Sequence, residues 1–246
     1  MNRNKRHILF GVILVVLSIV FYLIHYAIFR DAHHIFVYLV GDIAFVFIEV
    51  LIVTLIIERV LTERDRQVRL EKLNMVIGTF FSEVGTRLLS VFTGADPGVD
   101  DLGRELAIAP SWNDKDFSRA SSLLKSYSYP IDIRRVDLPA LRTFFEQERD
   151  FLLRLIENPN LLEHESFTDL LRAVFHVAEE LSARPGFDGL PESDYGHLAG
   201  DIRRVYGSLV REWIDYMKYL KNSYPYLYSL AVRTNPFDRN ASPVVR

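Results

Sequence analysis

The chain has 246 residues, a formal net charge of −3 at neutral pH and no cysteine. The near-balanced charge argues against nucleic acid as the main partner. The lack of cysteine excludes disulfides, thiolate metal sites and a cysteine nucleophile, so a metal ion would have to be held by histidine and carboxylate side chains.

Two apolar runs near the N-terminus have the length and composition of membrane-spanning helices. The first, residues 8–29, carries no formally charged side chain, and the second covers residues 35–57. Each reaches the roughly 20 residues that a helix needs to cross a bilayer. The first run is also longer than the apolar stretch of a cleaved signal peptide, which favours a retained anchor. Residues 1–57 therefore predict a transmembrane hairpin in the lipid bilayer.

The basic residues near the ends of these runs predict the orientation of the hairpin. The connecting turn offers only Arg30. The cations beyond the other two ends are Arg3, Lys5, Arg6, Arg59, Arg64, Arg66, Arg69 and Lys72. By the positive-inside rule, both termini are expected on the cytoplasmic side of a prokaryotic cytoplasmic membrane.

Two acidic residues, Asp42 and Glu49, lie inside the second apolar run. Their spacing of seven places them on one helix face, about 10 Å apart along the axis. Because a charge in hydrocarbon is costly, this polar stripe should face protein or water. Three interpretations remain open: a cation or proton path in an oligomer, pairing with Tyr22, His25 or Tyr26 of the first span, or proximity to a thinned interface.

The helix is predicted to continue beyond the membrane through residues 58–92 as a stalk. Residues 58–72 are strongly polar, and an apolar seam begins at Leu70 and is interrupted at Arg87. This seam favours a segment that is central either to the soluble domain or to an oligomeric stalk. The seam comprises Leu70, Leu73, Ile77, Phe80, Val84 and Val91. A second face carries the small residues Gly78, Ser82 and Gly85, which either admit a close-packed helix or simply face solvent.

Beyond the turn-forming residues 93–98, the pattern is helical throughout. Residues 99–233 contain helix-length amphipathic segments and no convincing period-two strand pattern. The predicted fold is therefore all-α: a two-helix transmembrane hairpin, a helical stalk and a cytosolic helical bundle domain. Residues 234–246 are expected to form a loose tail.

Two histidine–carboxylate pairs are the candidate metal ligands. His176 precedes Glu180 by four residues and His197 precedes Asp201 by four, so each pair lies on one helix face. If the two helices packed side by side, they could form a metal site of the kind found in helical bundles. The alternative is that these residues, which lie on polar faces, form only loose solvated ion pairs.

No Walker phosphate loop, dinucleotide fingerprint or familiar hydrolase or kinase motif is present. We therefore predict a homo-oligomeric integral membrane protein whose cytosolic domain is an interaction or regulatory module, with a cytosolic protein as possible partner and no cofactor required. Two other classes stay open. One is an oligomeric cation or proton channel lined by Asp42 and Glu49, and the other is a membrane-anchored, metal-dependent helical-bundle enzyme.

Overall fold

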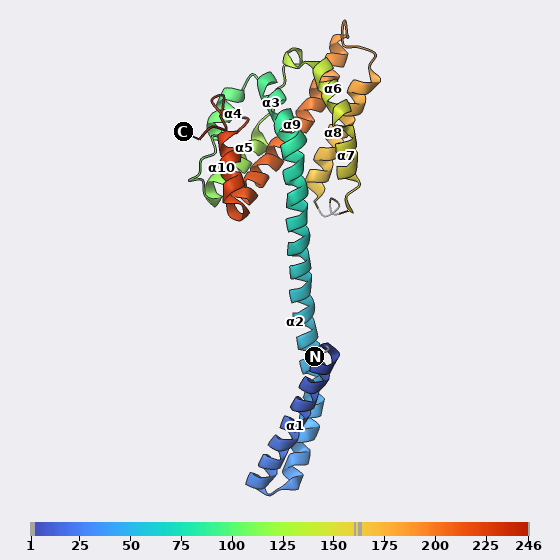
Figure 1. Ribbon diagram of the computed structural model, residues 1–246, viewed down its shortest axis with the longest axis vertical. Coiled ribbons are helices and arrows are strands. Elements are labelled where there is room, and N and C mark those ends of the chain that lie inside the picture. Colours follow the sequence, from blue (N-terminus) through green and yellow to red (C-terminus); the bar gives the residue numbers. More distant parts are fainter. Residues whose placement is uncertain (1–2, 160, 162–163, 246) are drawn as a thin grey trace. The chain divides into compact units, whose positions relative to one another are not determined.

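The computed structural model describes residues 3–159, 161 and 164–245, including side chains from residue 9 onward except at positions 32 and 34. All regular secondary structure in these residues is helical, and no strand occurs among them (Figure 1). The all-α prediction is therefore confirmed.

The predicted spans lie in the first two helices, α1 (Arg3–Phe29) and α2 (Ala32–Phe80). A short turn separates them, and Arg30 in that turn has a left-handed backbone with a φ of 55°. By length and composition, the run Leu9–Phe29 and the helical run that begins at Ile35 are both suited to cross a membrane.

The chain divides into two compact units, residues 1–66 and 67–246, which we call the N-terminal unit and the helical domain. The helical domain contains the end of α2 and the elements that follow it. These are the π-helical turn η1 (Phe81–Gly85), α3 (Thr86–Ala95), α4 (Val99–Glu105), α5 (Asp114–Ser126), the 3-10 turn η2 (Ile133–Arg135), α6 (Leu138–Gln147), α7 (Arg149–Ile156), α8 (Glu165–Ala183), α9 (Glu192–Ser223) and α10 (Pro225–Arg233).

The 32-residue helix α9 lies at the centre of the helical domain. It packs against α3, α5, α8 and α10, while α6 and α7 pack on α8 (Figure 1). Its apolar side chains recur at helical spacing and are almost completely buried, as are Phe80, Phe92 and Phe167 on the neighbouring helices. The resulting core holds α8 and α9 side by side.

The apolar seam of the predicted stalk enters this core rather than remaining outside it. Leu73, Ile77, Phe80 and Val84 are buried as the spacing predicts, but the next core residues are Leu88 and Phe92. The π-helical turn Phe81–Gly85 explains the change, because its wider turn adds one residue and shifts the core-facing positions. Arg87 is therefore exposed and Val91 only half-buried.

The three small residues lie in different environments. A methyl group at Gly78 would be 3.0 Å from the hydroxyl oxygen of Tyr216, so α9 reaches this face through a tyrosine ring. A methyl group at Gly85 would be 2.6 Å from the ring of Phe81 on the same helical run. Ser82 is exposed and lines a shallow cleft beside Tyr216.

The first residues of the predicted loose tail are docked on the helical domain. Asn235 is buried and donates a hydrogen bond from Nδ2 to the carbonyl oxygen of Leu106 at 2.8 Å. Phe237 is buried as well, with its ring centroid 5.1 Å from that of Trp213. The backbone amide of Phe237 also donates to Oδ1 of Asn235. This arrangement leaves residues 238–245 as the exposed end.

Candidate functional site

Helices α8 and α9 bring the two predicted histidine–carboxylate pairs together. The backbone amide of Phe167 donates to Nδ1 of His164, which caps the start of α8, and the apolar face of α8 is then buried in the core. Burial of the apolar face fixes the rotation of α8 about its axis, and this places His176 and Glu180 on the side of α8 that lies beside α9. The apolar face of α9, from Leu198 onward, sets the rotation of that helix in the same way.

The four side chains form a continuous chain of contacts. Oδ2 of Asp201 lies 3.2 Å from Nε2 of His176 and 3.3 Å from Nε2 of His197. Nε2 of His197 in turn lies 3.5 Å from Oε2 of Glu180. One potential ligand atom from each of His176, Glu180 and His197 lies within 4.8 Å of the others. We call these four residues the α8–α9 cluster.

Burial differs sharply within the α8–α9 cluster. Asp201, which sequence reasoning placed on a polar face, is only 4% exposed, whereas the side chains of His176 and His197 are 43% and 51% exposed. Oδ1 of Asp201 accepts a hydrogen bond from Arg204 at 3.1 Å. Oδ2 is buried and has no hydrogen-bond partner among the described residues, so its polar contacts are the two imidazole nitrogens. The cluster therefore has a buried carboxylate oxygen at its base and two histidines at its solvent side.

Arg184, which sequence reasoning missed, fixes the position of Glu180. It follows the last residue of α8 and donates to Oε2 of Glu180 at 2.8 Å and to both carboxylate oxygens of Asp194 at 2.9 and 2.6 Å. These bonds hold the pKa values of Glu180 and Asp194 below their usual range and raise the pKa of Arg184. The spacing of four between Glu180 and Arg184 was the available signal.

A second polar network lies inside the core around Asp96, which is 1% exposed. Its carboxylate accepts hydrogen bonds from the hydroxyls of Tyr127 and Tyr206, at 2.8 and 3.1 Å, and from the amide of Gly98 at 2.7 Å. Burial and the adjacent carboxylate raise the pKa of both tyrosines. Because these three donors are all paired with the carboxylate, the network connects the end of α3 to Tyr127 and to α9, which is a structural role.

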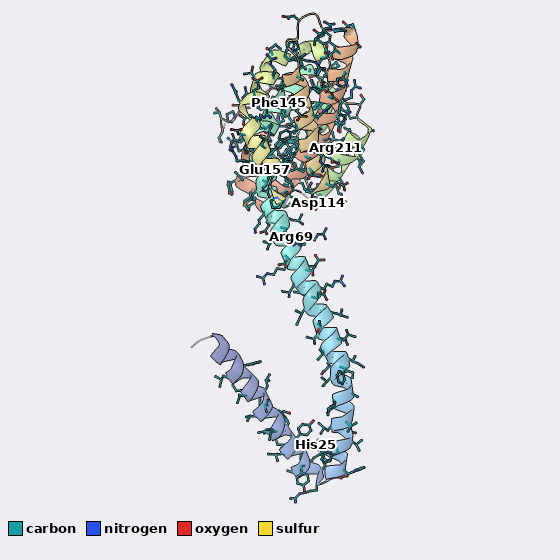
Figure 2. All side chains as sticks on the ribbon, turned by 90° about the vertical axis from the view of Figure 1, so that its right-hand side faces the viewer. His25, Arg69, Asp114, Phe145, Glu157 and Arg211 are labelled. Atoms are coloured by element: carbon teal, nitrogen blue, oxygen red, sulfur yellow. The ribbon has the colours of Figure 1, made fainter. Side chains whose placement is uncertain are left out.

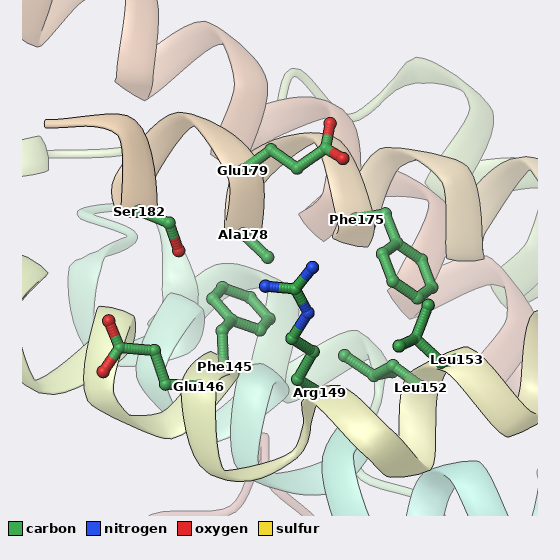
Figure 3. A pocket seen from close by; sticks show the side chains of 9 residues that line it. All are labelled: Phe145, Glu146, Arg149, Leu152, Leu153, Phe175, Ala178, Glu179 and Ser182. Carbon is green, nitrogen blue, oxygen red and sulfur yellow. The ribbon is translucent and has the colours of Figure 1, made fainter.

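A shallow cleft on the other side of α8 is lined by residues from α6, α7 and α8 (Figure 3). The guanidinium of Arg149 points into it, between the ring of Phe145 and the aliphatic chain of Leu152, with Glu179 at the rim. Among the described residues, the buried unpartnered side-chain oxygen belongs to Asp201 and not to this cleft. The α8–α9 cluster is therefore the stronger candidate site.

The predicted intramembrane residues lie in the N-terminal unit. Asp42 lines a cleft together with Ser18, Tyr22 and His25, and His25 lies near the turn that joins α1 and α2 (Figure 2). Glu49, two helical turns further along α2, does not line this cleft and is exposed. The structure thus brings His25 and Asp42 to one cleft and leaves Glu49 apart from them.

Comparison with known proteins assigns both parts of the chain. Residues 69–233 match the family described as "Uncharacterized protein MJ1433, C-terminal helical domain", and residues 2–61 match "MJ1433, N-terminal helical domain". The Methanocaldococcus jannaschii protein of that name is 47% identical over 241 residues, which cover 98% of this chain and 97% of the relative. No solved structure matches the chain. The chain therefore belongs to the MJ1433 family and contains both of its helical domains.

Proposed function

We propose that the protein is an integral membrane protein, anchored by α1 and the first part of α2, whose helical domain is an interaction or regulatory module. The exposed apolar surface of the N-terminal unit carries this proposal. The most apolar stretches of the two runs contain no buried residue among those described, and Phe21 and Phe47 are 68% and 74% exposed. A continuous apolar surface of this extent requires a partner, and its length matches a bilayer.

The helix α2 supports coupling between the membrane and the module. It contains the second span and also contributes Leu73, Ile77 and Phe80 to the core of the helical domain. One helix thus contributes residues to both units of the chain. We propose that this continuity couples the two parts, so that a conformational change in the spans alters the helical domain, and a change in the helical domain alters the spans.

The absence of cysteine makes a direct test of topology possible. Single cysteines are introduced at His33, at the start of α2, and at the exposed Ala241 near the C-terminus. A membrane-impermeant maleimide added to intact cells should label His33→Cys, but should label Ala241→Cys only after lysis. Release of the protein by alkaline carbonate, or labelling of Ala241→Cys in intact cells, would overturn the anchoring or the orientation.

Self-association is a separate part of the proposal. Native mass spectrometry of the full chain released from detergent should show a homo-oligomer. A monomer over the whole accessible concentration range would remove this part while leaving the anchoring intact.

The cleft shared by Asp42, Tyr22 and His25 favours polar packing within the hairpin over a pore. We therefore expect Asp42→Asn and Glu49→Gln to leave the cation flux of reconstituted vesicles unchanged. Loss of a measurable flux in these variants would instead establish the channel alternative.

A further inference from the structure

We propose that the α8–α9 cluster is a binding site for one zinc ion, with His176, His197, Asp201 and Glu180 as its ligands. The site would join the end of α8 to the beginning of α9. This inference goes beyond membrane anchoring and does not depend on it.

The spacing of the ligand atoms supports a tetrahedral ion. Zinc binds imidazole nitrogen and carboxylate oxygen at about 2.0–2.2 Å, so neighbouring ligands in a tetrahedron lie about 3.3–3.5 Å apart. The three contacts along the chain of ligands are 3.2, 3.3 and 3.5 Å. These three of the six ligand–ligand separations match a tetrahedral ion, and the ligand atoms of His176, Glu180 and His197 lie within 4.8 Å of one another, so a bound ion would draw the ligands closer together.

The buried oxygen of Asp201 points to the same conclusion independently. A carboxylate oxygen that is removed from water and left without a hydrogen bond is costly, so native proteins rarely retain one without a use. In the part of the chain that the structure describes, Oδ2 of Asp201 has no hydrogen-bond partner although it lies within 3.3 Å of two imidazole nitrogens. An ion at the centre of the cluster would coordinate this oxygen and both imidazoles at once.

The neighbouring arginines provide the supporting contacts that metal sites use. Arg204 donates to Oδ1 of Asp201, which fixes the carboxylate with Oδ2 toward the histidines. Arg184 holds Glu180 and is itself held by both oxygens of Asp194, with only 14% of its side chain exposed. Such contacts orient ligands before the ion arrives.

The donor set identifies the class of metal. Two imidazoles argue against magnesium and calcium, which prefer oxygen ligands, and a mixed set of imidazole and carboxylate ligands suits zinc among the first-row ions. Two carboxylates balance the double positive charge of the ion. Both histidines are about half exposed, so the ion can enter from solvent.

Four protein ligands complete a tetrahedral shell, which is typical of structural sites rather than catalytic ones. The ion would hold the loop of residues 184–191 in place and tie α8 to α9. Helix α9 is also the helix that α2 contacts, where Gly78 of α2 lies against Tyr216 of α9. We therefore assign the site a stabilising or sensing role in the module, and not a hydrolytic one.

The test uses the full-length protein in detergent, stripped with a chelator and titrated with zinc against a competing chromophoric chelator. We expect one zinc per chain and a rise in Tm of about 5–10 °C when free zinc exceeds Kd about 100-fold. His176→Ala, His197→Ala and Asp201→Asn should each weaken zinc binding by at least about 100-fold. Glu179→Gln, adjacent to the ligand Glu180 but facing the other cleft, is the matched control and should bind as the parent does.

The metal-free proteins provide a second measurement. Asp201→Asn keeps the side-chain shape and weakens only ion pairs with the half-exposed imidazoles and the exposed Arg204, so its metal-free Tm should lie within a few degrees of that of the parent. No zinc binding by the parent, or equal binding by the ligand variants, would overturn the site. A loss of metal-free Tm for Asp201→Asn as large as the rise that zinc gives the parent would indicate that the carboxylate serves a histidine–carboxylate ion pair instead, and an equal Tm rise with magnesium would overturn the assignment to zinc.

Discussion

Helices α1 and α9 are of similar length, 27 and 32 residues, but they differ in how their apolar side chains are distributed around the helix and in how exposed these side chains are. In α1 the apolar residues occupy every face, and those described from Leu9 onward are exposed or half-exposed. In α9 they occupy one face, where Leu198, Ile202 and Leu209 are 0% exposed. Periodicity, rather than hydrophobicity alone, therefore separates a helix that the chain can cover from one that needs an external apolar partner.

The sharpest test of this difference compares two phenylalanines on α2. Phe80 is 0% exposed and Phe47 is 74% exposed. Phe80→Ala should lower the free energy of unfolding of the helical domain by about 3–5 kcal/mol, because it leaves a cavity in a packed core. Phe47→Ala should leave it nearly unchanged. Denaturant unfolding of the full chain in detergent measures both values, and equal losses would show that the two units unfold as one.

The buried Asp96 network should produce the next largest effect. Asp96→Ala leaves the hydroxyls of Tyr127 and Tyr206 and the amide of Gly98 without their acceptor. We expect a loss of about 3 kcal/mol, since each unpaired buried donor costs about 1–3 kcal/mol. Asp100→Ala, which removes an exposed ion pair with Arg239, is the control and should cost less than about 1 kcal/mol. Similar losses for the two variants would contradict the structural role of Asp96.

Much of the fold follows from local patterns in the sequence. The apolar stripe of α8 and the period of α9 were sufficient to identify both helices, and the spacing of four identified the two pairs of the α8–α9 cluster. The contact between the pairs was a conditional prediction, because it depends on which helices are neighbours. Periodicity within one helix carries no information about that choice.

Other features lay beyond sequence reasoning for identifiable physical reasons. The π-helical turn at Phe81–Gly85 shifts the core register, and the only trace in the sequence was the charged Arg87 in an apolar seam. Asp201 resembles a surface residue until α8 covers it. Asp96 is 110 residues from Tyr206, so only tertiary structure reveals their hydrogen bond.

The π-helical turn allows a smaller, more local test. A methyl group at Gly85 would meet the rings of Phe81 and Phe80 at 2.6 and 2.9 Å, whereas one at Gly94 has open space. Gly85→Ala should therefore cost about 1–3 kcal/mol through overpacking. Gly94→Ala, in the regular helix α3, should stabilise the domain by about 0.5–1 kcal/mol. Thermal unfolding of both variants decides the matter, and a stabilised Gly85→Ala would mean that the turn relaxes to an ordinary α-helix.

The smallest effect concerns Arg184 and depends on pH. Because Arg184 hydrogen-bonds the ionised forms of Glu180 and Asp194, their pKa values in the folded state lie below the ordinary 4.5 and 3.8. The stability from these contacts is fully present above the ordinary pKa values and is lost as the pH falls through the lowered pKa values.

In metal-free protein, Arg184→Gln should therefore lower Tm by a few degrees near neutral pH, and the difference from the parent should shrink below about pH 4. Arg172→Gln removes an exposed pair with Asp169 on the same helix and should change Tm little at either pH. A Tm difference for Arg184→Gln that persists undiminished in acid would show that Arg184 stabilises the loop through packing or through the carbonyl of Glu180 rather than through the two carboxylates.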